Sequence, residues 1–296
     1  MKLVTYFPNP QAQPINGPWR QYDITDSLIY SHRSTEYDRD SYPSSLHFHD
    51  YYELLIFVEG NVRYICESSS ALPRYGDVII IPPGKLHMSL INSDHTRYER
   101  YVFYLYPEAF DCVGGRPLLH FMEQDRGDQF TFSLKRKHMD ELLPVLGQLD
   151  SILARGSSKD HALAIAYTLQ AFYLLDNLSA SDTAGDPYLP QNVIDIQHYL
   201  DEHFTEVASV SNVAEHFFYS REYVSRLFKR YLNTSVADYV ANRRVSYCQK
   251  LIISSNLPLI DICYRAGFGS VSAFIRMFQR ITGMAPSEYR RINKSS

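Results

Sequence analysis

The C-terminal third of the chain contains one segment twice. A shift of 50 residues aligns the two copies, and the identical pairs are Phe218 with Phe268, Ser220 with Ser270, Arg226 with Arg276, Phe228 with Phe278, Arg230 with Arg280 and Tyr239 with Tyr289. A repeat of this length is one supersecondary unit used twice. Each copy predicts a short helix, a tight turn and a Ser-capped helix with Arg on one face. This is the layout of a helix-turn-helix motif that binds DNA in the major groove.

The second helix of each copy carries the candidate DNA contacts. Its apolar residues recur at helical spacing and are expected to face the core, which leaves a polar face for base edges and phosphates. In the first copy the candidates are Ser220, Arg221, Glu222, Ser225, Arg226 and Lys229. In the second copy they are Ser270, Val271, Ser272, Ile275, Arg276 and Gln279.

Arginine on a helix surface is more often merely solvated than bound to a ligand. The equivalent placement of Arg226 and Arg276 in both copies favours DNA contact for this pair. Val271 and Ile275 are predicted on the exposed side, where they suit thymine methyl groups. Four aromatic residues are predicted in the core, namely Phe218, Phe228, Phe268 and Phe278.

A long helix is predicted over residues 236–254, between the two copies. Its 19 residues span about 28 Å at 1.5 Å per residue. That length is near the ~34 Å advance of one turn of duplex DNA. The helix is therefore expected to hold the two motifs at successive major-groove openings.

Residues 193–291 resemble the DNA-binding domain of the AraC/XylS family of bacterial transcription regulators. The matching residues are Ser220, Arg226, Leu227, Phe228, Lys229, Tyr239, Arg243, Arg244, Leu251, Ile262, Ala266, Gly267, Phe268, Ser272, Phe274, Arg276, Phe278, Gly283, Pro286, Ser287, Tyr289 and Arg290. The chain departs from the family pattern at Asn233, where Gly is usual, and at Cys248 and Cys263, where Ala is usual. The resemblance implies promoter DNA and RNA polymerase as partners, a homodimer, and activation rather than repression.

Charge is distributed unevenly along the chain. Residues 191–296 hold 13 Lys and Arg against 9 Asp and Glu, whereas residues 1–190 hold 16 against 24. Only the C-terminal part is therefore expected to meet a polyanion. The sequence shows no apolar run long enough for a membrane span and no secretory signal. Its four cysteines are scattered, so we expect reduced thiols in a cytoplasmic protein.

The N-terminal part predicts strands followed by a helical hairpin. Short β-branched and aromatic runs at residues 51–58, 62–66, 78–81 and 101–106 are separated by Gly and Pro, which is typical of a β-barrel or sandwich. Residues 133–178 show two helical stripes, expected to pack on the barrel or to form a dimer interface.

We therefore predict an α+β chain in two domains. A cupin-like sensing and dimerisation domain covers residues 1–178, including a proline-rich arm over residues 1–20. A small, polar linker covers residues 179–190, and an all-α domain with two helix-turn-helix motifs covers residues 191–296.

A group of polar residues in the predicted barrel has the spacing of a metal or ligand site. His47, His49 and Glu53 share the parity of one strand face, and His87 follows on a later strand. Three imidazoles and a carboxylate suit Mn, Fe, Ni or Zn. The spacing resembles the two cupin motifs. Two alternatives remain open: a bound divalent metal, or polar side chains that line a small-molecule pocket or bond to each other.

The resemblance favours a ligand sensor over an enzyme. Regulators of this family commonly carry a cupin-like barrel that senses a small molecule. Sixteen of the 24 tyrosines precede residue 191 and, with Trp19, suit stacking on sugar faces as well as ordinary packing. A metal-dependent cupin enzyme with a DNA-binding tail is the main alternative, and a constitutive DNA-binding protein with a vestigial barrel is another.

Overall fold

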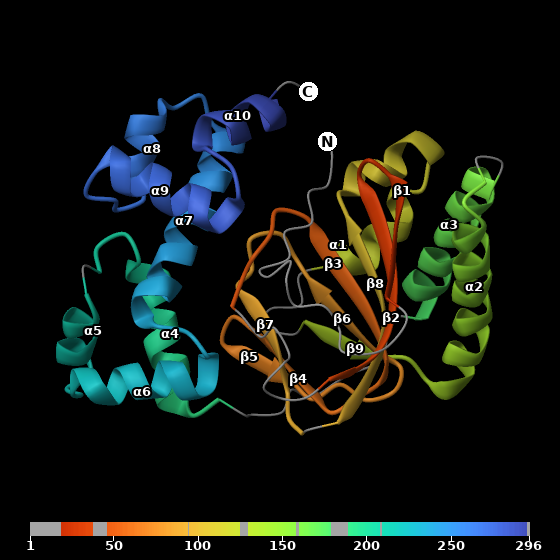
Figure 1. Cartoon of the computed structure of the whole chain (residues 1–296), viewed down its shortest axis with the longest axis horizontal. Coiled ribbons are helices and arrows are strands. Elements are labelled where there is room, and N and C mark those ends of the chain that lie inside the picture. The colour runs from red at the N-terminus through yellow and green to blue at the C-terminus, as the bar shows by residue number, and fades with distance from the viewer. Residues whose placement is uncertain are drawn as a thin grey trace.

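The computed structural model describes residues 19–37, 46–93, 95–124, 130–157, 160–178, 189–207 and 209–294 (Figure 1). The predicted arm and the predicted linker lie outside the described residues except at their C-terminal ends. Figure 1 shows a β domain flanked on one side by a helical hairpin and on the other by an all-α domain. Among the described helices, none is both long and apolar enough to cross a bilayer.

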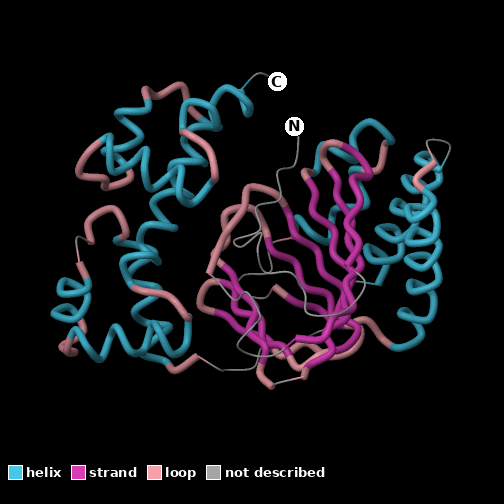
Figure 2. Tube along the Cα trace, viewed as in Figure 1, coloured by secondary structure: helices cyan, strands magenta, loops and turns pink. Residues whose placement is uncertain are grey.

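The β domain consists of two antiparallel sheets (Figure 2). The larger sheet has the order β1-β2-β8-β3-β6-β9 and the smaller sheet the order β5-β4-β7. The strands are β1 (Trp19–Thr25), β2 (Leu28–Tyr37), β3 (Tyr52–Glu59), β4 (Val62–Cys66), β5 (Ser69–Ala71), β6 (Asp77–Ile81), β7 (His87–Ile91), β8 (Thr96–Leu105) and β9 (Thr131–Ser133). The α+β prediction with an N-terminal β domain is confirmed.

Alternation along the strands divides the β domain into layers. On β3, Leu55 and Phe57 face an interior shared by both sheets, whereas Leu54 and Ile56 pack against the hairpin. On β4, Ile65 faces the all-α domain. The smaller sheet therefore lies between the barrel interior and the all-α domain.

The hairpin consists of α2 (Arg136–Arg155) and α3 (His161–Leu178), and it covers the larger sheet. It follows the short helices η1 (Pro107–Val113), η2 (Arg116–Leu119) and α1 (His120–Glu123). Helical periodicity predicts a buried stripe on α3 of Ala162, Ile165, Leu169, Phe172 and Tyr173. This prediction is partly wrong, because Ala162 and Tyr173 are exposed. The buried face instead consists of Ala164, Thr168, Ala171, Phe172 and Leu175.

The all-α domain holds two similar units joined by one long helix. The first unit contains α4 (Gln191–His203), α5 (Val210–His216) and α6 (Arg221–Leu232), and the second contains α8 (Leu259–Arg265), α9 (Val271–Thr282) and α10 (Pro286–Lys294). Between them runs α7 (Val236–Ser254), with the bounds that the sequence predicts. Each unit has its own apolar core. Asn233 ends α6 at φ 45°, so it adopts the left-handed conformation that Gly usually supplies.

The turn of the first helix-turn-helix unit differs from the prediction. The sequence predicts Phe218 in the core, but its side chain is 95% exposed and its backbone has φ 56°. The left-handed residue in the second unit is Gly267, at φ 80°. The turn before Ser220 is therefore one residue shorter than the turn before Ser270, and a constant shift of 50 residues hides this difference.

Replacing Phe218 with Gly is expected to stabilise the protein. A left-handed backbone destabilises a residue that has a Cβ by roughly 1–2 kcal/mol, and Gly removes this strain. Gly also makes the unfolded chain more flexible, which offsets part of the stabilisation. The exposed ring contributes little burial in compensation. We expect Phe218→Gly to raise the free energy of unfolding by roughly 0.5–1 kcal/mol, measured by urea unfolding. An unchanged or lower value would show that the turn is not strained.

Candidate nucleic-acid interface and candidate metal centre

The two recognition helices begin in the same way. Ser220 accepts a hydrogen bond from the backbone N–H of Tyr223 at 3.2 Å, and Ser270 accepts one from Ala273 at 3.2 Å. A serine cap satisfies one of the free amide groups of the first turn and fixes where the helix starts. Because both helices start at the same point of the repeat, their candidate side chains occupy equivalent helix positions.

The polar face of each recognition helix is open to solvent. The exposed candidates are Ser220, Arg221, Glu222, Ser225, Arg226, Lys229, Ser270, Ser272, Ile275, Arg276 and Gln279. Val271 differs from the expectation, because it is half-buried and packs against the apolar core of the second unit. Ile275 is 41% exposed and is the apolar side chain available on this face.

Arg226 and Arg276 have no ion-pair partner within the described part of the chain. The next arginine of the second unit behaves differently, since Arg280 pairs with Asp238 of α7 at 2.9 Å. Asp238 also accepts a hydrogen bond from Ser235, and these contacts lower its pKa. Arg280 is thus used within the protein, while Arg226 and Arg276 remain available to a phosphate or a base.

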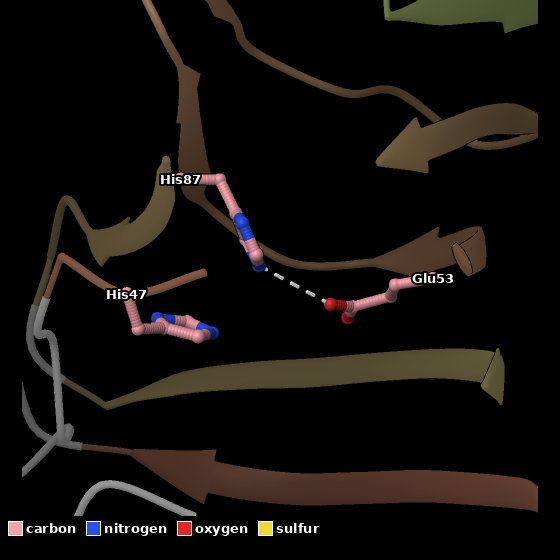
Figure 3. A group of neighbouring side chains, drawn as sticks. All are labelled: His47, Glu53 and His87. Carbon is pink, nitrogen blue, oxygen red and sulfur yellow. Dashed lines mark ion pairs between the residues drawn. The ribbon is translucent and has the colours of Figure 1, made fainter. Parts of the chain in front are cut away.

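The barrel interior brings together the polar residues that the sequence singles out (Figure 3). One ligand atom each of His47, Glu53 and His87 lies within 4.8 Å of the others. Glu53 Oε2 lies 3.2 Å from His49 Nε2 and 3.3 Å from His87 Nε2. Figure 3 shows the His87 and Glu53 side chains pointing toward one another, with His47 beside them. We call His47, His49, Glu53 and His87 the His/Glu cluster.

Backbone contacts fix which ring nitrogens face Glu53. His49 Nδ1 lies 2.8 Å from the Tyr51 carbonyl and His87 Nδ1 lies 2.9 Å from the Lys85 carbonyl. A carbonyl only accepts, so each Nδ1 carries the proton and each Nε2 of a neutral ring presents a lone pair. Hydrogen bonds from the ring N–H to a backbone carbonyl orient histidine ligands in metal sites.

The electrostatics of the His/Glu cluster favour a cation between its members. Burial lowers the pKa of His49, which keeps that ring neutral. Burial opposes ionisation of Glu53, but hydrogen bonds that His49 and His87 donate when protonated hold its pKa well below the usual range. Neutral rings turn their Nε2 lone pairs toward the carboxylate instead, an arrangement that a divalent cation would balance. His87 is 3% exposed, and its Nε2 lacks a hydrogen bond among the described atoms although Glu53 is close. A divalent cation fits this set of lone pairs and carboxylate.

The aromatic residues around the His/Glu cluster are mostly buried. Tyr51 stacks on His49 at 4.1 Å between ring centroids, and Tyr104 and Tyr106 pack edge-on against Tyr51. The hydroxyls of Tyr64 and Tyr98 bond to each other inside the barrel. These rings serve packing here. The side chain of Trp19, the other stacking candidate, lies outside the described parts.

A polar contact between the two domains involves residues that the sequence analysis does not assign. Arg243 of α7 pairs with Glu67 of the β4–β5 turn at 3.0 Å and with Asp201 of α4 at 2.8 Å. Glu67 also accepts a hydrogen bond from the Leu86 amide at 2.9 Å. Tyr289 of α10 donates to Asp50 at 2.6 Å. The sequence marks Arg243 and Tyr289 only as family matches, and nothing local marks Asp50 or Glu67.

The Asp201 carboxyl is expected to make stability depend on pH. Burial raises the pKa of Asp201 to about 7, with Arg243 opposing and Glu67 adding to the rise. The unfolded carboxyl titrates near 3.8, so the folded chain binds a proton that the unfolded chain releases, and stability falls as pH rises toward 8. Urea unfolding should show a loss of roughly 1 kcal/mol between pH 6 and pH 8. Asp201→Asn should remove this part of the dependence; equal slopes for both proteins would refute the assignment.

Two family models match the chain in the order of its domains. One, described as an AraC-like ligand binding domain, matches residues 31–172, and one described as a helix-turn-helix domain matches residues 213–292. The regulator YdiP of Escherichia coli is 27% identical over 86% of this chain and 83% of its own. The arabinose operon regulatory protein of Salmonella typhimurium is 25% identical over 73% of this chain and 75% of its own. The transcriptional activator RhaS of Enterobacter is 22% identical over 83% of this chain and 87% of its own.

A ligand-binding β domain followed by two helix-turn-helix units defines a DNA-binding transcription regulator with a sensor. The chain belongs to the AraC family of transcriptional regulators and carries an N-terminal ligand-binding domain.

Proposed function

We propose that this regulator binds promoter DNA through α6 and α9 together and responds to a small molecule or metal ion in the barrel. The observation that carries the proposal is the pair of exposed arginines, Arg226 and Arg276, at equivalent positions of two Ser-capped helices. Figure 1 shows α6 and α9 near opposite ends of α7, so one protomer presents two recognition helices.

Selection of binding sequences from random duplexes tests whether the two helices bind DNA together. Recovered sites should contain two motifs about one helical turn apart, and recovery of a single motif would contradict joint binding.

Two observations, the residues of the sensor domain and the names of the relatives, support two classes of effector. The arabinose operon regulator among the relatives supports a carbohydrate effector, although the barrel tyrosines are occupied in packing. The His/Glu cluster supports a divalent metal, Zn, Ni, Mn or Fe, held by His47, His49, Glu53 and His87. When bound, such an ion would supply the positive charge toward which the Nε2 atoms of His49 and His87 and the Glu53 carboxylate point. We propose binding rather than catalysis, because the relatives are transcription regulators.

Zinc is the probe for the metal assignment. Added Zn²⁺ at ~100 times its Kd should stabilise the folded chain by about 2.7 kcal/mol in a thermal shift assay. His87→Gln should weaken Zn²⁺ affinity by at least about tenfold, whereas His120→Gln, at an exposed position outside the cluster, should change nothing. Equal stabilisation of both variants would place the metal elsewhere. A sugar panel in the same assay tests the carbohydrate alternative.

Dimerisation and the direction of regulation are also proposed. Leu163 and Tyr173 of α3 are 47% and 57% exposed, so the outer face of the hairpin offers apolar surface to a second copy. The activator among the relatives favours activation through contact with RNA polymerase. We place the protein in the cytoplasm, where its proposed DNA partner is found.

A further inference from the structure

The wall between the His/Glu cluster and the DNA-binding domain consists of two short segments, residues 46–50 and residues 84–88. They pair through His47 and His87, whose amides and carbonyls exchange hydrogen bonds of 3.0 and 2.9 Å. The Gly84 amide also donates to the His49 carbonyl at 2.7 Å. The two segments therefore form one unit, and a displacement of either is passed to the other.

Alternate residues of this wall face opposite sides. His47, His49 and His87 belong to the cluster. Phe48, between the first two, packs against the apolar cores of both helix-turn-helix units. Leu86 and Met88, on either side of His87, are buried in the core of the first unit. Each cluster histidine is thus joined by one peptide bond to a residue that contacts the DNA-binding domain.

Polar contacts fix the same wall to the long helix and to the C-terminal helix. Asp50 accepts hydrogen bonds from Tyr289 of α10 at 2.6 Å and from Tyr106 at 2.8 Å. Ser246 of α7 donates to the Gly84 carbonyl at 3.2 Å. Arg243 of α7 reaches Glu67, which in turn holds the Leu86 amide. The wall therefore contacts α7, which joins the two recognition units, and α10, which ends the second unit.

We infer that the His/Glu cluster controls the DNA-binding domain directly through this wall, so that a change in the cluster alters how firmly α7 and α10 are held against the barrel. This inference rests on the proposed function for its biological role. It differs from a signal carried by the hairpin, because the contacts described join the wall directly to α7 and α10. A ligand that gathers the three imidazoles restrains residues 47, 49 and 87 and should strengthen the contacts of their neighbours.

Hydrogen exchange of the full chain, followed by mass spectrometry, tests the coupling in both directions. His47→Ala removes one half-buried cluster ring, and amides of α7 and α10 should then exchange faster by about fivefold, the low end of common coupling factors. His120→Ala is the matched control, since it removes an exposed histidine outside the wall. Coupling is reciprocal, so Tyr289→Phe, which loses only the hydroxyl bound to Asp50, should raise exchange in residues 46–50. Tyr223→Phe is its control, because the Tyr223 hydroxyl bonds to Asn192 within the same domain.

Responses in both directions support the inference, and changes confined to the domain that carries each substitution overturn it. Operator binding is measured on the same samples. A chain that shows the reciprocal exchange response but binds no DNA would retain the coupling and refute the regulator assignment. A chain that binds DNA without the exchange response would refute the coupling and retain the regulator assignment.

Discussion

Gly267→Ala should lower the free energy of unfolding by about 3 kcal/mol or more, since left-handed strain and backbone overlap add together. Gly267 ends the turn after α8 at φ 80°, where a residue with a Cβ is strained. A Cβ at this position would overlap the Thr205 carbonyl and lie 2.7 Å from its carbon and 2.8 Å from its Cα. These atoms belong to the backbone, so no side-chain rotation relieves the overlap.

The loop that carries Thr205 is also held from the other side. Arg244 of α7 donates to the Phe204 carbonyl at 2.8 Å and to the Val207 carbonyl at 2.9 Å. Moving the loop away from Ala at position 267 would break these charge-assisted bonds. Gly267 is therefore the point where the first unit and the turn of the second unit touch backbone to backbone.

Gly156→Ala is the matched control for this substitution. Gly156 ends α2 at φ 65°, but a Cβ there meets nothing within 4 Å. It should cost only the conformational penalty of roughly 1–2 kcal/mol. Urea unfolding followed by far-UV circular dichroism measures both variants, with the transition of each domain analysed separately if two appear. Equal losses would show that the Thr205 loop moves freely.

Local patterns predicted those parts of the fold that local physics determines. Ser220, Ser270 and Gly283 delimit the recognition helices because caps act within one turn. Strand parity predicts His47, His49 and Glu53 on one face of a single strand, but in the structure His47 and His49 precede β3. The bridge between His47 and His87 brings the group beside Glu53 instead. The apolar face of α3 was misassigned because this helix is apolar on most sides, so periodicity does not select one face.

Contacts between the domains carried no comparable signal. Tyr289 and Asp50 are separated by 239 residues, and Arg243 and Glu67 by 176. No periodicity links such positions, and each residue type is ordinary for a surface. The prediction that Phe218 is buried was wrong for another reason. An alignment at constant offset assumes turns of equal length, and one missing residue moved a ring from the expected core into solvent.

The largest effect on function is expected at the two unpaired arginines. Arg226→Ala and Arg276→Ala should each cost roughly 1–3 kcal/mol of operator affinity if the side chain contacts a base. The two residues lie in separate units, so their effects should add, and the double variant should lose roughly 2–6 kcal/mol. Gel-shift titration at fixed salt measures this, because phosphate contacts make affinity depend on ionic strength.

Lys250→Ala separates a base contact from a general loss of charge. Lys250 is an exposed cation on α7, outside both recognition helices, so its removal makes the same charge change without touching the predicted interface. A base contact lowers affinity for the operator much more than for random DNA, whereas a phosphate contact lowers both alike and reduces the salt slope by about 1. Arg226→Ala could lower affinity for operator and random DNA alike, as Lys250→Ala does, while Arg276→Ala lowers operator affinity much more. In that case only α9 would contact bases, and α6 would contact the DNA phosphates. Full affinity in the double variant would contradict the assignment of Arg226 and Arg276 as DNA contacts.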